Sequence, residues 1–399
     1  MNFFKKMYCR MFQGVMKIAL PMMPYREPKP LESVLEISGL LKELNIDNVI
    51  IITDKGIRDL KLTKSLEKDL KDNRIKFVVF DEVVPNPTSA NVENAVTVYN
   101  ENGCKAIIAF GGGSVMDCAK AMGARVVNPK KPLSKMKGLL KVKYPLPTLI
   151  AIPTTAGTGS ETTVSAVITD SVTHHKYVIN DFDLIPHYAV LDATLTLGLP
   201  MGLTATTGMD ALTHAIEAFI GKATTDATRK NALEAARLIF ENLPRVMEDG
   251  KNERARGQML RASYLAGLAF TRSYVGYVHA IAHSLGGKYG TAHGLANAVI
   301  LPYVLSEYGN TIYDKLKVMA VYCNIARPYE SEELATNKLI NRIIEMNEIY
   351  GIPKTFDFIK EEDIPQMAKN ADKEANPLYP VPKLMNAKEL EKMYYRIKQ

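Results

Sequence analysis

The stretch Ala106-Ile107-Ile108-Ala109-Phe110-Gly111-Gly112-Gly113-Ser114 decides the fold of this sequence. Its unbroken apolar run is typical of a strand buried on both faces of a parallel sheet. The run passes into three glycines, and a helix-like stretch follows from Asp117. Free backbone N–H groups and the helix dipole at such a turn favour phosphate, which predicts an anion site. Because Met116 stands where G-x-G-x-x-G would have its third glycine, a tight turn without ligand is the alternative.

Similar runs lie on both sides of this strand and set the domain organisation. The other continuous apolar runs are 49–52, 77–80 and 149–152, and helix-like stretches at 31–44 and 90–100 lie between strands. This βαβα rhythm predicts a doubly wound α/β layer. Helix-like segments then follow at 206–219, 227–243, 254–270 and 278–285. We therefore expect an α/β domain over 1–195 and a helical domain over 196–399.

Composition excludes several classes of protein. The 399 residues are 47% hydrophobic and 23% charged, which is ordinary for a globular chain. The charges are interleaved despite a net +7, so no nucleic-acid partner is expected. The four cysteines lack paired spacing, which argues against disulfides and favours the cytoplasm. No apolar run approaches about 18 residues, so we expect no membrane span and no membrane partner.

The N-terminal segment 1–23 is mildly apolar behind Lys5, Lys6 and Arg10, which faintly suggests a signal peptide. Lys17 and Pro21 interrupt the apolar stretch, however, and no clear cleavage site follows. The segment is interpreted instead as a short edge strand or hairpin. Such an edge could pair with a partner chain.

Two histidine motifs stand out in the helical half. Asp210 and His214 are four residues apart, as are His279 and His283, so each pair shares a helix face. Gly286-Gly287 is expected to break the second helix, and His293 follows. All these positions have apolar surroundings, where imidazoles and a carboxylate are costly to bury without a partner. A divalent cation, Fe(II) or Zn(II), suits such an N/O set. The alternative is that each pair is an ordinary core or surface pair whose hydrogen bonds are satisfied within the protein. This alternative is disfavoured more strongly for the whole set than for any single pair.

Two further features of the α/β half suggest nucleotide binding. The loop Pro153-Thr154-Thr155-Ala156-Gly157-Thr158-Gly159-Ser160-Glu161 could hold a sugar or phosphate with its hydroxyls and amides, or could be an ordinary polar loop. Asp54 closes a strand, where a carboxylate can accept both hydroxyls of an adenosine ribose and would repel a 2′-phosphate. A helix N-cap is the alternative for Asp54.

Together these motifs resemble the iron-containing (group III) alcohol dehydrogenases. The resemblance runs from about residue 45 to the C-terminus and rests on the glycine turn with Asp117, the 153–161 loop, Gly208–Glu217, and His279, His283 and His293-Gly294. It implies a dehydroquinate synthase-like architecture: a Rossmann-like α/β domain, an all-helical domain and an active site in the cleft between them. It also implies hydride transfer between NAD(H) and a small primary alcohol or aldehyde, and a homodimer or higher homo-oligomer.

The resemblance also assigns residues. It implies that Asp210, His214, His279 and His293 bind the metal, Fe(II) in the cell with Zn(II) as a contaminant, and that His283 relays a proton. The implied cofactor-binding residues are Asp54, Asn86, Gly112, Gly113, Ser114, Asp117, Thr154, Thr155, Thr158 and Lys176. The acid at Asp54 favours NAD over NADP.

The same scaffold could serve other functions. A dehydroquinate synthase-like lyase needs basic groups for a phosphorylated substrate, and only Arg272 lies among the metal-binding motifs. Hydroxyacid–oxoacid transhydrogenation is closer, because Arg272 could hold a carboxylate. A non-enzymatic metal-stabilised or assembly protein is disfavoured by the intact ligands and glycine turn. Segments 24–28 and 270–274 depart from the family pattern, and the second of these leaves the choice of alcohol open.

Overall fold

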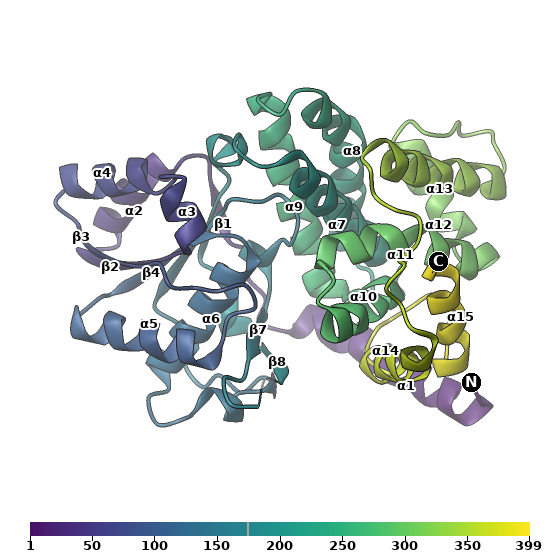
Figure 1. The fold of residues 1–399 in the computed structure, drawn as a ribbon, viewed down its shortest axis with the longest axis horizontal. Helices are drawn as coiled ribbons and strands as arrows, with labels where there is room; N and C mark the ends of the chain where they lie inside the picture. Colours follow the sequence, from purple (N-terminus) through teal and green to yellow (C-terminus); the bar gives the residue numbers. More distant parts are fainter. Residues whose placement is uncertain (174) are drawn as a thin grey trace. The chain divides into compact units, whose positions relative to one another are not determined.

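The computed structural model describes residues 1–173 and 175–399, which form two compact units. One unit is Pro24–Gly198, and the other combines Met1–Met23 with Leu199–Gln399 (Figure 1). The sequence placed the division at 195/196 and assigned residues 1–23 to the first domain. In the structure the division falls at Gly198/Leu199, and the N-terminal segment joins the helical unit.

The α/β unit is built on a parallel sheet. Within its described residues the strand order is β1-β9-β6-β4-β2-β3, and every pairing in this sheet is parallel. The strands are β1 (Lys29–Leu31), β9 (Tyr188–Val190), β6 (Thr148–Pro153), β4 (Ala106–Gly111), β2 (Asn48–Ile52) and β3 (Lys76–Phe80). The predicted doubly wound layer is confirmed, and each of the four predicted strands forms.

Helices cover both faces of this sheet, which explains the continuous apolar runs in β2, β3, β4 and β6. Ile107 packs into a core with α5 (Ser89–Glu101) and α6 (Gly113–Val127), whereas Ile108 packs into a core that includes α2 (Ile37–Glu43) and α4 (Lys64–Asp72). The short helix α3 (Lys55–Asp59) follows β2. A second sheet has the order β5-β8-β7 and comprises β5 (Gly138–Leu139), β8 (Lys176–Asn180) and β7 (Ser165–Thr169).

The other unit is helical, as predicted. Its helices are α1 (Phe3–Ala19), α7 (Met201–Ile220), α8 (Asp226–Glu248), α9 (Glu253–Ser273), α10 (Tyr277–Tyr289), α11 (His293–Tyr308), α12 (Tyr313–Tyr322), α13 (Glu332–Ile349), α14 (Ile364–Ala375) and α15 (Ala387–Ile397). In the described part of the chain, none of the helices is both long and apolar enough to cross a bilayer.

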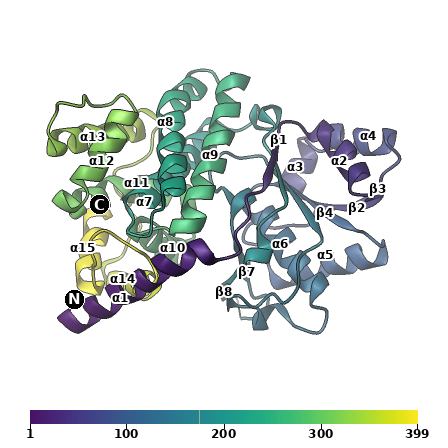
Figure 2. The ribbon, with the colours of Figure 1, turned by 180° about the vertical axis from the view of Figure 1, so that it is seen from behind.

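Two local predictions were wrong. Residues 3–19 form helix α1 rather than an edge strand or hairpin, because Cys9 and Gln13, four residues apart, are buried along one helix face (Figure 2). Gly286-Gly287 does not break α10, which continues to Tyr289 and ends at Gly290 in the left-handed conformation, with φ +69°. Packing of α10 against α11 and α14 offsets the low helix propensity of the two glycines.

Candidate metal centre

Three helices bring the predicted metal ligands together. Asp210 and His214 lie one turn apart on α7, His279 lies in the first turn of α10, and His293 begins α11. Each of the four offers one donor atom, and these atoms all lie within 4.8 Å of one another. The cluster therefore has the composition and the compactness of a divalent-cation site.

The surroundings favour the neutral form of His279 and His293, which is the form of imidazole that binds metals. Burial and the neighbouring histidines hold the pKa of His279 well below its usual range. The His293 side chain is 40% exposed, yet desolvation of its ring still lowers its pKa to about 4. His214 is buried and stacks on Phe270, with ring centroids 4.2 Å apart.

The hydrogen bonding of one donor atom, Nε2 of His279, tests whether a divalent cation fits this cluster. His279 Nε2 is buried and, within the described residues, makes no hydrogen bond; Asp210 Oδ1 lies 3.9 Å away. Asn297 Nδ2 donates to the same Asp210 oxygen over 2.7 Å. A buried nitrogen without a hydrogen bond is costly, and a cation bound by Asp210 and the histidines would satisfy it. The residues therefore fit a divalent cation.

Glu217 orients one of these ligands, and sequence reasoning gave it no role. Its Oε2 lies 2.6 Å from His279 Nδ1, and the backbone N–H groups of Gly276 and Val278 donate to the same carboxylate at 2.7 and 2.8 Å. A Cβ at Gly276 would lie 2.6 Å from Glu217 Oε1, so glycine is required there. Burial raises the pKa of Glu217 to about 7, against the effect of these hydrogen bonds. The signal was present in the sequence, because Glu217 is seven residues after Asp210 and shares its helix face.

His283 has a partner of its own. Its Nδ1 lies 2.6 Å from Glu374 Oε1 on α14, which also accepts a hydrogen bond from Tyr379 Oη at 2.7 Å. Burial opposes the charged imidazole, but the Glu374 carboxylate prevails and raises the pKa of His283. The His283 ring stacks beside His293, with centroids 5.2 Å apart. No sequence pattern links Glu374 to His283 across 91 residues.

The α/β unit gathers most of the predicted cofactor residues at one edge of its sheet. Gly112 caps α6, and a Cβ at Gly113 would lie 3.3 Å from Thr158 Cγ2, so the glycine turn packs closely against the second loop. A Cβ at Gly112 would lie 3.9 Å from Thr155 Oγ1, and the Thr154 N–H donates to Gly111 O at 3.2 Å. Both loops follow adjacent strands, β4 and β6.

Three more cofactor candidates contact one another. The backbone N–H of Asn86 donates to Ser114 Oγ at 3.3 Å, and Lys176 Nζ donates to Asn86 Oδ1 at 2.8 Å. Asp54 stands apart from this chain of contacts, at the end of β2, where its Oδ1 accepts from the Ile57 N–H at 2.9 Å and caps α3. The N-cap alternative for Asp54 is therefore present in the structure.

Asp117 supports the second loop from within. Its two oxygens accept from Ser160 Oγ at 3.2 Å and from the Val167 N–H at 3.1 Å, and burial raises its pKa to about 6. Lys120, missed by sequence reasoning, is fully buried one turn later on α6. Its Nζ donates to Thr163 Oγ1 at 2.7 Å and to Ser160 Oγ at 3.3 Å. Both side chains shape the loop that carries Thr158.

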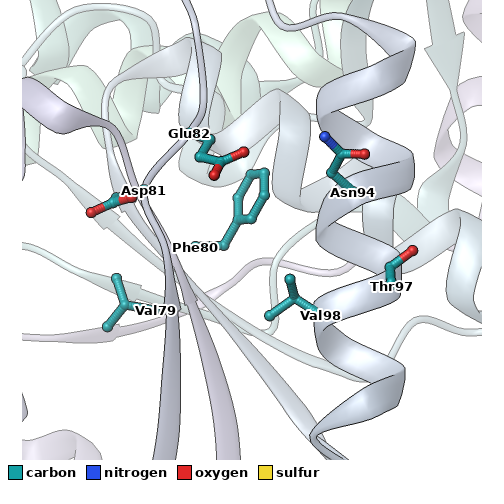
Figure 3. Close-up of a pocket in the computed structure, with 7 residues that line it drawn as sticks. All are labelled: Val79, Phe80, Asp81, Glu82, Asn94, Thr97 and Val98. Atoms are coloured by element: carbon teal, nitrogen blue, oxygen red, sulfur yellow. The ribbon is translucent and has the colours of Figure 1, made fainter.

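A pocket elsewhere in the α/β unit involves none of the predicted site residues. It lies between β3 and α5 and is lined by Val79, Phe80, Asp81, Glu82, Asn94, Thr97 and Val98 (Figure 3). Val79, Phe80 and Val98 contribute apolar side chains to its lining, and Asp81 and Glu82 are the charged residues among the described residues that line it. No lysine or arginine is among the described residues of this lining, so the glycine turn is the better candidate for an anion site.

Comparisons with known proteins find relatives over most of the chain. The family model "Iron-containing alcohol dehydrogenase" matches residues 31–193, and "Fe-containing alcohol dehydrogenase family, C-terminal" matches residues 204–397. A 1,3-propanediol dehydrogenase of Citrobacter freundii is 39% identical over 88% of this chain and 92% of its own length. An NAD-dependent methanol dehydrogenase of Bacillus methanolicus is 35% identical over 85% of this chain and 89% of its own length. A crystal structure of a 1,3-propanediol oxidoreductase matches with a TM-score of 0.89 and 34% identity, over 94% of this chain and 99% of the other.

Proposed function

Because the chain belongs to the iron-containing alcohol dehydrogenase family, we propose that it interconverts a small primary alcohol and its aldehyde with NAD(H). The observation that carries this proposal is the convergence of Asp210, His214, His279 and His293, whose donor atoms lie within 4.8 Å of one another. The intact glycine turn after β4 supports a dinucleotide partner.

Asp210 and the three imidazoles would hold the cation. When bound, a divalent cation supplies Lewis acidity that polarises an alcohol or carbonyl oxygen, and NAD supplies the hydride acceptor. Glu217 accepts the Nδ1–H of His279 and so keeps Nε2 of that ring as the metal donor.

His283 handles the proton in this proposal. Oxidation of a primary alcohol gives an aldehyde with loss of one hydride and one proton. Since Nδ1 of His283 is bonded to Glu374, its Nε2 is the atom free to take the hydroxyl proton. Glu374 stabilises the resulting imidazolium, and Tyr379 holds that carboxylate in place.

Iron is the proposed metal, on the strength of family membership. Zn(II) binds N/O sites more tightly than Fe(II) in the general affinity order, so zinc is the expected contaminant after purification. Activity restored anaerobically by Fe(II) would support iron, whereas an enzyme active with Zn(II) alone would contradict it.

NAD is proposed over NADP because Asp54 stands at the end of β2, beside the strand that leads to the glycine turn. A carboxylate there accepts ribose hydroxyls and repels a 2′-phosphate. Asp54→Ser keeps a side chain able to cap α3 and removes the charge. We expect this variant to raise kcat/KM for NADP relative to NAD by at least about tenfold. An unchanged ratio would place the ribose elsewhere.

A short alcohol is the proposed substrate. The relatives named above act, by their names, on 1,3-propanediol and methanol, and Phe270 narrows the surroundings of His214 with an apolar ring. The test is a panel of alcohols, diols and aldehydes with Fe(II) under anaerobic conditions, following NADH. Absence of free NADH formation with every substrate would contradict the proposal, and turnover without released NADH would indicate transhydrogenation. A homodimer or higher homo-oligomer in the cytoplasm stays a prediction.

A further inference from the structure

Helix α1 lies outside the residues that the family models match. It ends at Ala19, before both matched ranges, 31–193 and 204–397. The helix lies along the helical unit beside α14 (Figure 2). A segment outside the matched fold that nevertheless forms an ordered helix calls for a function of its own.

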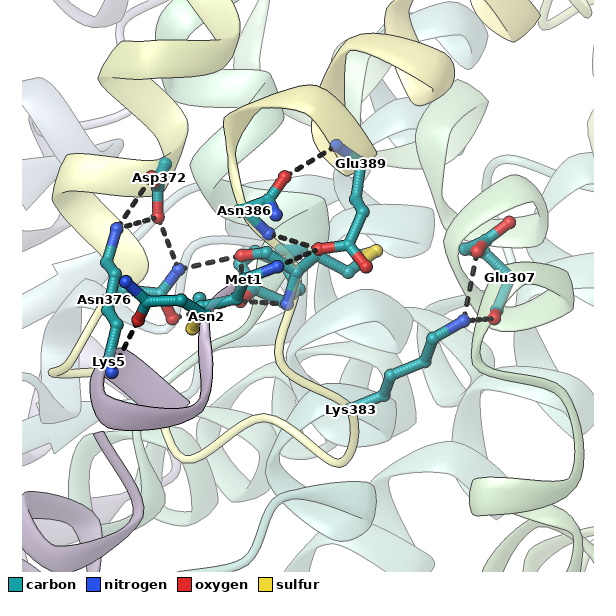
Figure 4. Close-up of polar contacts among 11 residues, drawn as sticks. Met1, Asn2, Lys5, Glu307, Asp372, Asn376, Lys383, Asn386 and Glu389 are labelled. Carbon is teal, nitrogen blue, oxygen red and sulfur yellow. Dashed lines mark hydrogen bonds and ion pairs between the residues drawn. The ribbon is translucent and has the colours of Figure 1, made fainter. Parts of the chain in front are cut away.

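Polar contacts fasten the inner side of α1 to the unit. Arg10 donates to Val381 O at 2.7 Å and to Pro382 O at 2.8 Å, and Gln13 Nε2 donates to Tyr379 O at 2.7 Å. Lys5 pairs with Asp372 at 2.9 Å, and the amino group of Met1 lies 3.6 Å from Glu389 (Figure 4). These contacts fix which face of α1 points away from the protein.

The outward face of α1, together with Met22 just beyond the helix, is apolar and exposed to solvent. Its side chains keep half or more of their surface exposed: Phe3 73%, Phe4 74%, Met7 54%, Tyr8 52%, Met11 64%, Val15 61%, Ile18 73% and Met22 82%. At 3.6 residues per turn the members from Phe3 to Ile18 span an arc of about 140°. This outer face is continuous over the length of the helix. A continuous exposed apolar strip is typical of an interaction site.

Charge shows which partner fits. Every charged side chain of α1 is basic, namely Lys5, Lys6, Arg10 and Lys17, and no acidic residue occurs before Glu27. Lys6 and Lys17 are exposed and flank one side of the outer face. A helix with an apolar face and basic flanks is typical of binding in the plane of an anionic bilayer.

A second copy of the chain fits less well. An antiparallel, two-fold pair of α1 helices would place both sets of Lys6 and Lys17 on the same side of the seam, where like charges repel. A two-helix seam also needs only a narrow stripe, and the outer face is wider than that. The apolar interior of a bilayer is a planar layer, and it could contact all of the arc at once.

We propose that α1 binds the surface of a bilayer rich in anionic lipids, with Phe4, Met11 and Ile18 entering the interface and Lys6 and Lys17 at the headgroups. This peripheral mode revises the sequence expectation of no membrane partner, which rested on the lack of a span. It does not depend on the proposed enzymatic function.

The experiment is flotation of the full chain with vesicles of phosphatidylcholine containing roughly one quarter phosphatidylglycerol, against vesicles of phosphatidylcholine alone. We expect flotation with the anionic vesicles and at least about tenfold weaker binding to the neutral ones. The variant Phe4→Ser/Met11→Ser/Ile18→Ser should lose flotation, and Lys6→Glu/Lys17→Glu should weaken it at least about tenfold. The matched control, Val172→Ser/Leu334→Ser/Ile349→Ser, changes three other exposed apolar side chains and should float like the parent.

Three results would overturn the proposal. One is no flotation of the parent chain with anionic vesicles, and another is equal flotation of the serine variant on α1. The third is a halving of the light-scattering mass by the same serine variant, which would make a second copy the occupant. Thermal unfolding of each variant, expected to match the parent, shows that the fold is intact.

Discussion

Glu217 Oε2 lies 2.6 Å from His279 Nδ1, joining α7 to α10 behind the candidate metal centre. This contact sets the tautomer of His279, because a carboxylate acceptor keeps the proton on Nδ1 and leaves Nε2 for the cation. The same carboxylate accepts the N–H groups of Gly276, which precedes α10, and of Val278 in its first turn. One buried side chain therefore places both a metal ligand and the helix that carries it.

Replacing Glu217 by glutamine should weaken metal binding. Gln retains one oxygen acceptor but lacks the charge that makes His279 a stronger base, so we expect the metal affinity to fall about 10- to 100-fold. Competition with a chelator of known affinity measures this directly. Glu248→Gln, an exposed glutamate at the end of α8, is the matched control. Unchanged affinity in Glu217→Gln would show that the contact serves only to join the helices.

Removing His283 should separate proton handling from metal binding. We expect His283→Ala to bind one metal ion per chain like the parent and to lose about 100-fold or more in kcat, because a positioned acid–base group contributes on that scale. Metal content measured on the same preparation as the rate provides the check. Loss of the metal together with activity would make His283 a ligand instead.

The backbone conformation of Tyr274 predicts that a glycine variant at this position is more stable than an alanine variant, the reverse of the usual order. Tyr274 has φ +61° and ψ 178°, a region that is essentially restricted to glycine and costs other residues about 1–3 kcal/mol. Tyr274→Gly should therefore be more stable than Tyr274→Ala by about 1 kcal/mol in denaturant unfolding, although both lose the same aromatic ring. At Tyr350, with φ −89°, the alanine variant should be at least as stable as the glycine variant. The same order at both positions would rule out strain at Tyr274.

His187 predicts acid sensitivity of the α/β unit. Its Nδ1 accepts the Leu149 N–H at 3.1 Å, and burial, aided by the Arg26 guanidinium, lowers its pKa to about 4. The unfolded chain binds the proton at about pH 6.5, so the folded state loses stability as the pH falls from about 6.5 towards 4.

Comparison with a variant isolates this effect from other titrations. Burial raises the pKa of Asp117 to about 6 and of Glu161 to about 7, and their folded forms therefore gain stability as the pH falls, with the opposite sign. His187→Asn keeps an acceptor for Leu149 but does not titrate. The stability of the parent relative to this variant should decline by roughly 1–3 kcal/mol between about pH 7 and 4.5. A constant difference would contradict the assignment.

Much of the fold followed from the sequence because its signals are local. The apolar runs at 49–52 and 106–110 require burial on both faces, and a parallel sheet with helices on each side provides it. The i, i+4 spacing drew attention to Asp210, His214 and His279, and the family resemblance implied a ligand set of these three with His293. The structure brings the four into one cluster. Helix α1 was mistaken for an edge because its buried positions, Cys9 and Gln13, are few and one of them is polar.

The features of the site that the sequence did not predict are contacts between segments far apart in the chain. Glu374 reaches His283 only because α14 packs against α10. Lys120 finds its acceptors in a loop some 40 residues later. Neither contact can be predicted from the spacing of residues in a single sequence.

We propose that one cation, held by Asp210, His214, His279 and His293, is required for alcohol oxidation. The most direct measurement is anaerobic titration of Fe(II) into metal-stripped protein, with NADH formation followed at each addition. We expect negligible activity in the stripped protein and activity that rises linearly and saturates at one equivalent of Fe(II) per chain. Oxidation of alcohol by the stripped protein at an undiminished rate would contradict it.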